Sequence, residues 1–482
     1  MSDETSIVDF SILEQSLRVE RMEFDEQSEP NINFVPCVTW VRRGVAKPVP
    51  ERVKLTADEL AEVINQAKKD LENVEKDDNE SDSEEATTND DKKKSDKKDK
   101  TEDDIIDEYG LDTYDDEEES AEGGGKLLGL GDLTSFADPR QDPFLSLDKD
   151  LGEDDEEDQD DFNIRSTDNL ILAGHVEGDS AMVEVYVYND VEDALYIHHD
   201  IMLQSFPLTL EWLSYDPESD KRGSLVAVGT MEPIIEVWDL DLVDSLEPAF
   251  KLGVKGSKKR GVKRVGHKDA VLSLSWNSNV DNVLGSGSAD HTALVWDMSQ
   301  QSVVSRLECH QEKVQAVSWH PFEQHALVTG ACDSYVRVFD CRTVGQHKKW
   351  SVGQGGEVER VVWDHFNPHR LLASSDQGSV VCVDLRQERK PVWTLSAHSD
   401  AVTGLSLSSQ CPGALVTVSQ DKVLKVWDIS GESPEFVVER DVNLGQLHAC
   451  APCPDAPFVV SMGGDKKSDN FKVRRYVLFF ST

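Results

Sequence analysis

The sequence predicts an all-β protein, a seven-bladed β-propeller with a disordered acidic N-terminal region and a short helix. Three observations support this fold class. A pattern of about 44 residues recurs in the C-terminal two-thirds of the chain, and short apolar runs with strand periodicity fill each recurrence. The third is charge: of the net −45 of the chain, −27 falls within residues 72–161.

The recurring unit is defined by four aligned positions. Its copies begin at His267, His310, Gln354 and His398, which are 43, 44 and 44 residues apart. A turn aspartate recurs in each copy, at Asp290, Asp333, Asp376 and Asp421. Twenty-nine residues after each start lies Trp296, Phe339, Val383 or Trp427, and each is followed by aspartate. Because four positions keep their spacing to within one residue through four units, the pattern indicates a true structural repeat.

Each unit has the composition of one propeller blade. Runs such as 271–276 and 293–297 alternate apolar and polar residues, as half-buried strands do, and clusters of Gly, Ser, Asp and Asn separate them. Four such strands make a blade. A single blade cannot bury both of its faces, so neighbouring blades must stack around an axis until the ring closes.

Three further blades bring the predicted total to seven. Upstream, residues 224–229 and 235–239 predict one blade, and 169–174 with 183–188 predict the inner strands of the first. Downstream, residues 458–480 predict a degenerate last blade. We expect the two chain ends to share a blade, with residues 33–41 forming a strand that returns from far upstream to complete the propeller.

The remaining chain divides by composition. Residues 1–55 form an N-terminal segment that contains the strand, and 56–76 predict an amphipathic helix with a capping box and one apolar stripe. That stripe packs on the propeller or docks a partner. Residues 77–161 are too acidic and too poor in aromatics to form a core, so we expect disorder. The propeller then occupies 162–482.

The acidic region carries two kinds of local signal. Ser81 and Ser83 are followed by acidic residues, which acidophilic kinases prefer, so both are phosphorylation candidates; an unmodified solvated tail is the alternative. Apolar islands within 127–147 are typical of linear motifs that dock on a partner or on the chain's own propeller.

A basic insert at 251–265 lengthens one unit, because Trp238 and Trp296 are 58 residues apart. Clustered positive charge of this kind is typical of nuclear-import signals and RNA phosphate contacts, and a solvated loop is the alternative. The candidate residues are Lys258, Lys259, Arg260, Lys263 and Arg264.

No motif in the sequence points to catalysis. Cys450 and Cys453 form one CxxC pair without the second pair that a zinc site requires, and phosphate-binding or nucleophile-elbow motifs are missing. We therefore expect no enzymatic activity, no cofactor, no metal and no small-molecule substrate. The acidic N-terminus does not resemble a secretory signal, and no apolar run is long enough to span a membrane. The scattered cysteines are typical of a protein in a reducing compartment.

The units resemble the WD-repeat family, since one begins with Gly266-His267 and ends with Trp296-Asp297. The resemblance implies a buried hydrogen-bond network of His, Ser or Thr, Asp and Trp in each blade. It assigns His267, Asp290 and Trp296 to one network and His398, Asp421 and Trp427 to another, with the hydroxyl from Ser286 or Ser288 and from Thr417 or Ser419. The unit at His310 has Asp333 but Phe339 in place of Trp. The unit with Asp376 has neither His nor Trp, so no complete network is expected there.

The whole chain also resembles the periodic tryptophan protein 1 family. The resemblance rests on residues 36–47, a helix, a long acidic tract, then residues 168–171, 198–203 and 232–248 and the basic insert. It implies a nuclear and nucleolar WD-repeat scaffold in ribosome biogenesis, acting in rRNA transcription or in maturation of the large-subunit precursor. Proteins of pre-ribosomal particles and pre-rRNA are the implied partners.

A second hypothesis is a chromatin-associated propeller that binds histones and regulates transcription. The propeller region carries a net charge of −13, and together with the acidic tract this favours basic protein ligands by long-range attraction. The sequence leaves open which face of the propeller binds and whether RNA is contacted directly.

Overall fold

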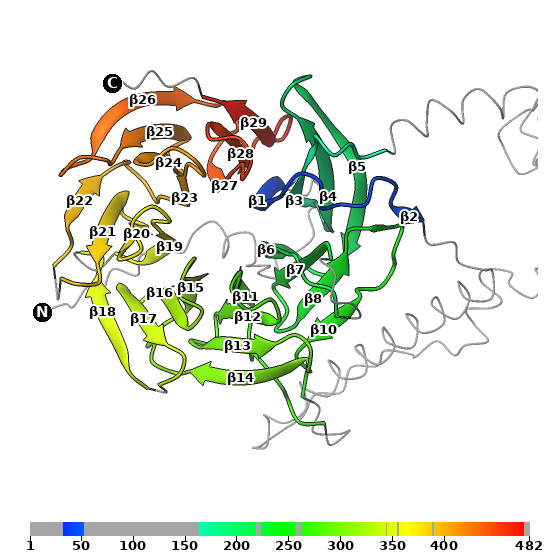
Figure 1. The fold of residues 1–482 in the computed structure, drawn as a ribbon, viewed down its shortest axis with the longest axis horizontal. Helices are drawn as coiled ribbons and strands as arrows, with labels where there is room; N and C mark the ends of the chain where they lie inside the picture. Colours follow the sequence, from blue (N-terminus) through cyan, green and yellow to red (C-terminus); the bar gives the residue numbers. More distant parts are fainter. Residues whose placement is uncertain are drawn as a thin grey trace, which may run out of the picture. The chain divides into compact units, whose positions relative to one another are not determined.

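Short β-strands are arranged around a closed ring in the computed structural model of the protein (Figure 1). The structure describes residues 32–52, 163–217, 223–256, 262–343, 345–353, 356–387 and 390–476. The chain divides into two units, Met1–Val53 with Phe162–Thr482, and Lys54–Asp161. The predicted helix at 56–76, the predicted disorder at 77–161, Ser81 and Ser83 lie outside the described residues.

The strands occupy four positions from the centre of the ring outward. The innermost are β1 (Asn33–Val41), β6 (Pro207–Leu213), β11 (Val271–Trp276), β15 (Val314–Trp319), β19 (Val358–Trp363), β23 (Gly404–Leu407) and β27 (Leu447–Pro452). The second are β3 (Asn169–Glu177), β7 (Leu225–Thr230), β12 (Val283–Ser288), β16 (Ala326–Ala331), β20 (Arg370–Ser375), β24 (Ala414–Val418) and β28 (Val459–Gly464). The third are β4 (Ser180–Asn189), β8 (Ile235–Asp239), β13 (Ala293–Asp297), β17 (Tyr335–Asp340), β21 (Ser379–Asp384), β25 (Val423–Asp428) and β29 (Phe471–Arg475).

Six blades have a fourth, outermost strand. These strands are β5 (Ala194–Leu203), β10 (Phe250–Leu252), β14 (Ser302–Leu307), β18 (His347–Ser351), β22 (Trp393–Ser396) and β26 (Glu435–Asp441). Each blade is an antiparallel sheet in which neighbouring strands are consecutive in the chain, apart from the pair β1 and β3 and the pair β8 and β10. We number the blades 1 to 7 in chain order, from the sheet of β1 to the sheet of β27. The predicted all-β, seven-bladed propeller is confirmed.

The predicted sharing of one blade by the two chain ends is wrong. The strand at Asn33–Val41 has the bounds expected from the sequence, but it pairs with β3 as the innermost strand of blade 1. β27, β28 and β29 form a separate sheet, blade 7. The strands at 169–174 and 183–188 are accordingly the second and third of blade 1. The acidic stretch is an insertion between the first and second strands of that blade, so the N-terminal strand already has a place within its own sheet.

A glycine on the second strand allows neighbouring blades to pack closely. A Cβ at Gly229 would lie 3.0 Å from Val271 Cγ1, and one at Gly287 would lie 2.9 Å from Val314 Cγ1. A Cβ at Gly330 would meet Val358 in the same way, and one at Gly463 would meet Val35 across the closure of the ring. In each case the first valine of an innermost strand fills the space beside the preceding blade, so the residue opposite must lack a side chain.

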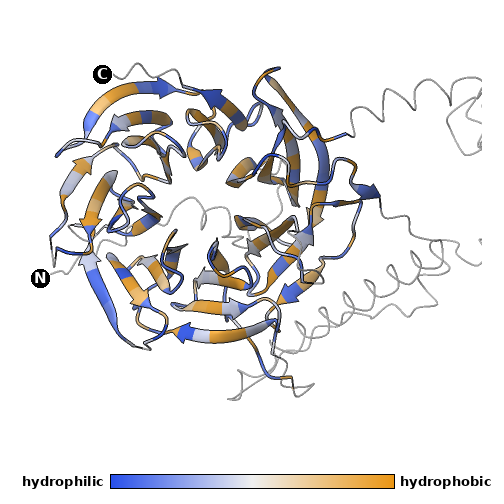
Figure 2. Cartoon of the chain, viewed as in Figure 1, coloured by the Kyte–Doolittle hydropathy of each residue, from blue (hydrophilic) through white to orange (hydrophobic). Residues whose placement is uncertain are grey.

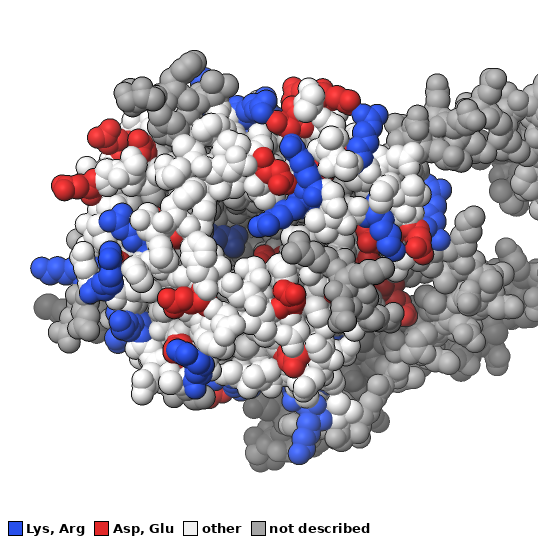
Figure 3. Space-filling model, viewed as in Figure 1, with Lys and Arg blue, Asp and Glu red and all other residues white. Residues whose placement is uncertain are grey.

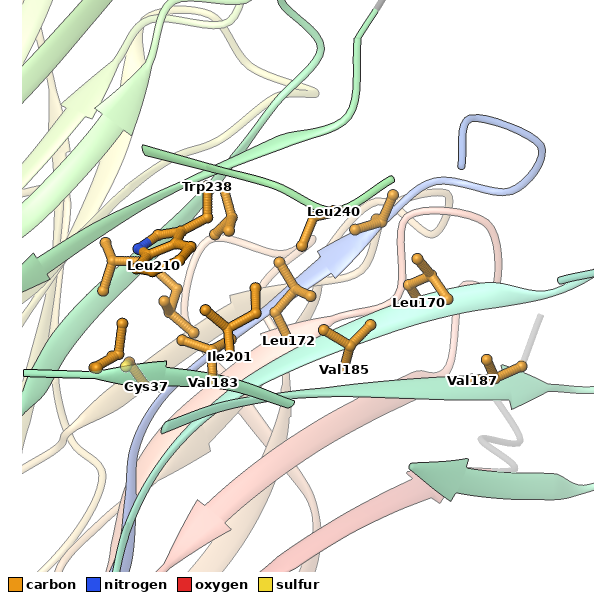
Figure 4. Packing of buried hydrophobic residues seen from close by; sticks show 14 of the residues in the cluster. Cys37, Leu170, Leu172, Val183, Val185, Val187, Ile201, Leu210, Trp238 and Leu240 are labelled. Carbon is orange, nitrogen blue, oxygen red and sulfur yellow. The ribbon is translucent and has the colours of Figure 1, made fainter. Parts of the chain in front are cut away.

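Hydrophobic side chains fill the spaces between successive blades. In Figure 4, Cys37, Val183 and Ile201 of blade 1 lie in one cluster with Leu210 and Trp238 of blade 2. Figure 2 shows the corresponding colouring, in which inner strands are largely hydrophobic and the outer strand β18 is mostly hydrophilic. Apolar burial of this kind contributes roughly 25 cal/mol per Å² and is the main term that stabilises the ring.

Candidate functional site: blade networks and central channel

Blade 3 contains a buried chain of four hydrogen-bonded side chains. The Nδ1 of His267 lies 3.2 Å from Asp290 Oδ2, and its Nε2 lies 2.7 Å from the hydroxyl of Ser286. The Nε1 of Trp296 donates to the same hydroxyl at 2.8 Å. Of the two serines that the sequence left open, the structure therefore selects Ser286; Ser288 instead accepts from the backbone N–H of Asp290.

The protonation pattern follows from the donors and acceptors. Burial by itself would raise the pKa of Asp290, but hydrogen bonds from His267 and Thr292 outweigh it and lower that pKa well below its usual range. An ionised carboxylate only accepts, so Nδ1 of His267 carries the proton and Ser286 donates to Nε2. Ser286 and His267 are only 0% and 1% exposed. Although Ser, His and Asp are linked in the order of a catalytic triad, no substrate reaches them, and the network is structural.

Blade 6 has the same network with threonine in place of serine. His398 Nδ1 lies 2.9 Å from Asp421 Oδ2, and its Nε2 lies 2.8 Å from Thr417 Oγ1, to which Trp427 Nε1 donates at 3.0 Å. Burial lowers the pKa of His398, although Asp421 opposes that shift. The structure therefore selects Thr417 as the hydroxyl, and Ser419 accepts from the N–H of Asp421.

Blade 4 has Phe339 at the tryptophan position, and an arginine that the sequence analysis did not identify completes its network. Arg337 is 4% exposed, and its guanidinium contacts His310 Nδ1 at 2.8 Å and Asp333 at 2.8–2.9 Å. Because arginine only donates, Nδ1 of His310 accepts and its Nε2 donates to Thr329 at 2.8 Å. The histidine tautomer is thus opposite to that in blade 3. Burial and the charge of Arg337 lower the pKa of His310 to about 3.

In blade 5 the structure describes no such network. Asp376 Oδ1 accepts the backbone N–H of Glu357 at 2.8 Å, and Gln354 lies outside the described residues. Among the four turn aspartates only Asp376 lacks a histidine beside it in the described part of the chain. Its carboxylate instead holds the loop that leads into β19.

A second set of polar side chains links the innermost strands of adjacent blades. Thr209 and Glu211 of β6 accept the backbone N–H groups of Leu274 and Trp276 on β11. Ser273 and Ser275 of β11 accept those of Val317 and Trp319 on β15, each at 3.0 Å. Sequence reasoning missed this set. The available signal was a hydroxyl at the same position in successive units, with a second acceptor two residues further on.

The innermost strands of all seven blades surround a central cavity of about 170 Å³. Its lining is mostly aliphatic or small, and includes Cys37, Thr209, Ser273, Ala316, Gly404 and Ala449. Among the described residues that line it, Arg360 is the one charged side chain. Figure 3 shows the mouth of this opening, with basic atoms visible at depth. A channel of this size accommodates a small ligand or the tip of one side chain.

The basic insert is shorter than predicted. Lys251 and Leu252, which we assigned to it from the sequence, end strand β10 by pairing with Glu236 and Ile235. The insert proper leaves the ring through a bridge between Val254 and Val265. Lys263 and Arg264 are exposed, and Arg264 Nη1 donates to the carbonyl of Lys268 at 3.2 Å. Lys258, Lys259 and Arg260 lie outside the described residues.

The cysteines carry free thiols, and those of the CxxC pair point apart. Burial raises the pKa of Cys450, which lines the central cavity, to about 12, whereas the Sγ of Cys453 lies 3.8 Å from Asn169 Oδ1. Within the described ranges, no group of three or more His, Cys, Asp or Glu side chains is arranged to hold a metal ion. That same part of the chain contains no helix long and apolar enough to cross a membrane.

Known proteins resemble the chain both in its repeats and along its length. The family model "WD domain, G-beta repeat" matches residues 260–297, 301–340 and 389–428. A "Periodic tryptophan protein 1 homolog" of Drosophila melanogaster is 37% identical over 444 residues, covering 91% of this chain and 93% of the relative. "Periodic tryptophan protein 1" of Saccharomyces cerevisiae is 31% identical, covering 90% of this chain and 87% of its own.

A more distant relative matches less than half of the chain. The "Ribosome biogenesis protein WDR12 homolog" of Drosophila mojavensis is 23% identical over 216 residues, which cover 43% of this chain and 49% of the relative. The similarity to the two periodic tryptophan proteins instead extends over nine-tenths of the chain, well beyond the repeats. This chain is therefore a WD-repeat propeller protein that belongs to the periodic tryptophan protein 1 family.

Proposed function

We propose that this protein is a non-enzymatic scaffold of the nucleus and nucleolus that acts in ribosome biogenesis, in rRNA transcription or in large-subunit precursor maturation. The observation that carries the proposal is the near full-length similarity to the periodic tryptophan proteins, joined by the resemblance to a protein named for ribosome biogenesis. The geometry supports a scaffold because the Ser-His-Asp groups of its blades are buried and already hydrogen-bonded to one another.

Two basic surfaces support contact with pre-rRNA as well as with proteins of pre-ribosomal particles. One is the basic insert, where Lys263 and Arg264 are exposed. The other is β18, whose His347, Lys348 and Lys349 are all exposed and whose Trp350 Nε1 anchors the strand to the carbonyl of Gln387 on blade 5. Lysines on a fixed strand bind phosphates without reading sequence, which suits a structured RNA backbone.

The alternative is a chromatin-associated propeller that binds histones. Its support is the net charge of −45, which attracts basic protein tails. Phosphorylation of Ser81 and Ser83 would increase that negative charge and strengthen such attraction. This alternative predicts association with nucleosomes rather than with precursor particles.

Sedimentation of nuclear extract on a sucrose gradient separates the two functions. A scaffold of ribosome biogenesis migrates with large-subunit precursors, and ribonuclease treatment moves it to lighter fractions. A histone-binding propeller instead migrates with nucleosomes and shifts after nuclease digestion of DNA. Failure to migrate with any precursor particle, in cells that actively make ribosomes, contradicts the proposed function.

A further inference from the structure

One position of the innermost strands is occupied by a small side chain in six blades and by arginine in the seventh. In blades 2, 3 and 4 the residue at this position pairs with a glycine on the second strand. These pairs are Thr209–Gly229, Ser273–Gly287 and Ala316–Gly330. Its occupants, in blade order, are Cys37, Thr209, Ser273, Ala316, Arg360, Gly404 and Ala449, and all of them line the central cavity. Arg360 alone extends a long charged side chain at this level of the channel.

The side chain of Arg360 is held at one nitrogen and free at two. Its Nε donates at 3.0 Å to the carbonyl of Thr403, the residue just before β23, and this bond fixes the plane of the guanidinium. Within the described part of the chain, no acceptor contacts Nη1 or Nη2, and no Asp or Glu lines the cavity. Four N–H donors in fork geometry are therefore available to a ligand.

The positive charge acts across the ring. Burial raises the pKa of Cys37 to about 12 on blade 1 and of Cys450 to about 12 on blade 7, and the charge of Arg360 opposes both shifts. The nearest acidic residue in sequence, Glu359, does not line the cavity, and burial raises its pKa to about 7. Arg360 is half-buried, and its charge also opposes the raised pKa of Glu359, so the guanidinium attracts anionic groups on both sides of its strand.

The cavity also offers hydroxyl donors and enough room. The hydroxyl oxygens of Thr209 and Ser273 accept hydrogen bonds from backbone N–H groups of the next blade. The hydroxyl protons of both residues can therefore donate to a ligand. A volume of about 170 Å³ is several times the roughly 30 Å³ that one water molecule occupies in the liquid. We propose that the central channel binds one small oxyanion, a phosphate or a carboxylate, which the Arg360 guanidinium holds through two parallel hydrogen bonds.

Thermal unfolding of the full-length protein tests this site. Chloride is replaced by inorganic phosphate in one arm and by acetate in the other, at constant pH and ionic strength. A bound anion stabilises the folded state by mass action, so above the dissociation constant the midpoint should rise with the logarithm of the anion concentration, by about 2–4 °C at ten times that constant. A rise with phosphate alone identifies a phosphate site, and a rise with acetate identifies a carboxylate site.

Variants separate binding from a general salt effect. Arg360→Met should abolish the part of the rise that comes from binding, and Arg360→Lys, which keeps the charge but loses the fork, should weaken binding at least tenfold. The matched control is Arg342→Met, because Arg342 is an exposed arginine that already pairs with Asp340 at 2.6 Å. This control should respond like the unaltered protein. If neither anion raises the midpoint of the unaltered protein more than that of Arg360→Met, or if Arg360→Lys and Arg342→Met respond equally, the inference is wrong.

Discussion

The indole Nε1 of Trp40 donates a 2.8 Å hydrogen bond to the hydroxyl of Ser461, 421 positions later in the chain. The same N–H lies 3.0 Å from the carbonyl of Ala451, and the ring packs edge-on against Tyr188 at 5.7 Å. Trp40 belongs to the innermost strand of blade 1, and Ser461 to the second strand of blade 7. One buried side chain therefore links the first and last blades where the ring closes.

Trp40→Phe should destabilise the protein by about 1–3 kcal/mol, because it leaves the acceptors of a buried donor unsatisfied while keeping an aromatic ring. The control is Trp276→Phe, whose Nε1 donates within its own blade to the exposed carbonyl of Asp281. Denaturant titration of both variants gives the free energies of unfolding. Equal losses would mean that closure does not depend on the Trp40 bond.

Ser286→Ala should cost about 2–3 kcal/mol, since both His267 and Trp296 lose the partner they share. Thr329→Val in blade 4 should cost less, about 1–2 kcal/mol, because only His310 is bonded to that hydroxyl. The same titration measures both. A larger loss for Thr329→Val would show that the arginine network of blade 4 is the more strongly coupled of the two.

Gly287→Ala should destabilise the protein by about 1–3 kcal/mol through overpacking. The new Cβ would lie 2.7 Å from Val317 Cγ2 and 2.9 Å from Val314 Cγ1, both on the next blade. Gly431→Ala is the matched control, because its nearest neighbour would be the Ser433 carbonyl at 3.6 Å. A neutral Gly287→Ala variant would show that the blades separate at little cost.

His310 should make stability fall as the pH drops below about 6.5. Burial and Arg337 lower the pKa of His310 to about 3 in the folded state, against about 6.5 in the unfolded chain. Between these values the unfolded state binds the extra proton, so acid increasingly favours unfolding from pH 7 to pH 5. His310→Gln should remove that part of the slope between pH 7 and pH 5.

The control for this pH dependence is His369→Gln, since His369 is exposed. Its slope should match that of the unaltered protein. If His310→Gln also leaves the slope unchanged, His310 does not have the lowered pKa in the folded protein.

Replacing Lys258, Lys259, Arg260, Lys263 and Arg264 by alanine should reduce nucleolar accumulation without unfolding the blades. Import receptors and RNA both respond to clustered charge, whereas a loop insertion tolerates such changes at little thermodynamic cost. Circular dichroism checks folding, and imaging of the tagged protein in cells measures localisation. An unchanged nucleolar signal in a folded variant would leave the insert as a solvated loop and shift attention to residues 92–100.

The sequence alone was sufficient for the propeller, the number of blades and the family, because these properties are repeated along the chain. A strand period of two and the recurring Trp296 and Trp427 are local patterns that need no knowledge of distant contacts. The same applies to the strand at Asn33–Val41, whose bounds follow from its own composition. The strand that it pairs with could not be predicted in this way, because a strand pairs with whichever sheet has an open edge beside it.

Tertiary structure decided the features that depend on residues far apart in the sequence. Arg337 could replace the missing tryptophan only because β17 directs it toward His310, and Trp40 found its partner 421 residues away. Strand pairing also decided which sheets the insertions interrupt. The acidic stretch falls between β1 and β3, which pair with each other, and the basic insert falls between β10 of blade 2 and β11 of blade 3. Backbone hydrogen bonds between strands form only when distant segments meet in the folded chain, so local composition could not assign those partners.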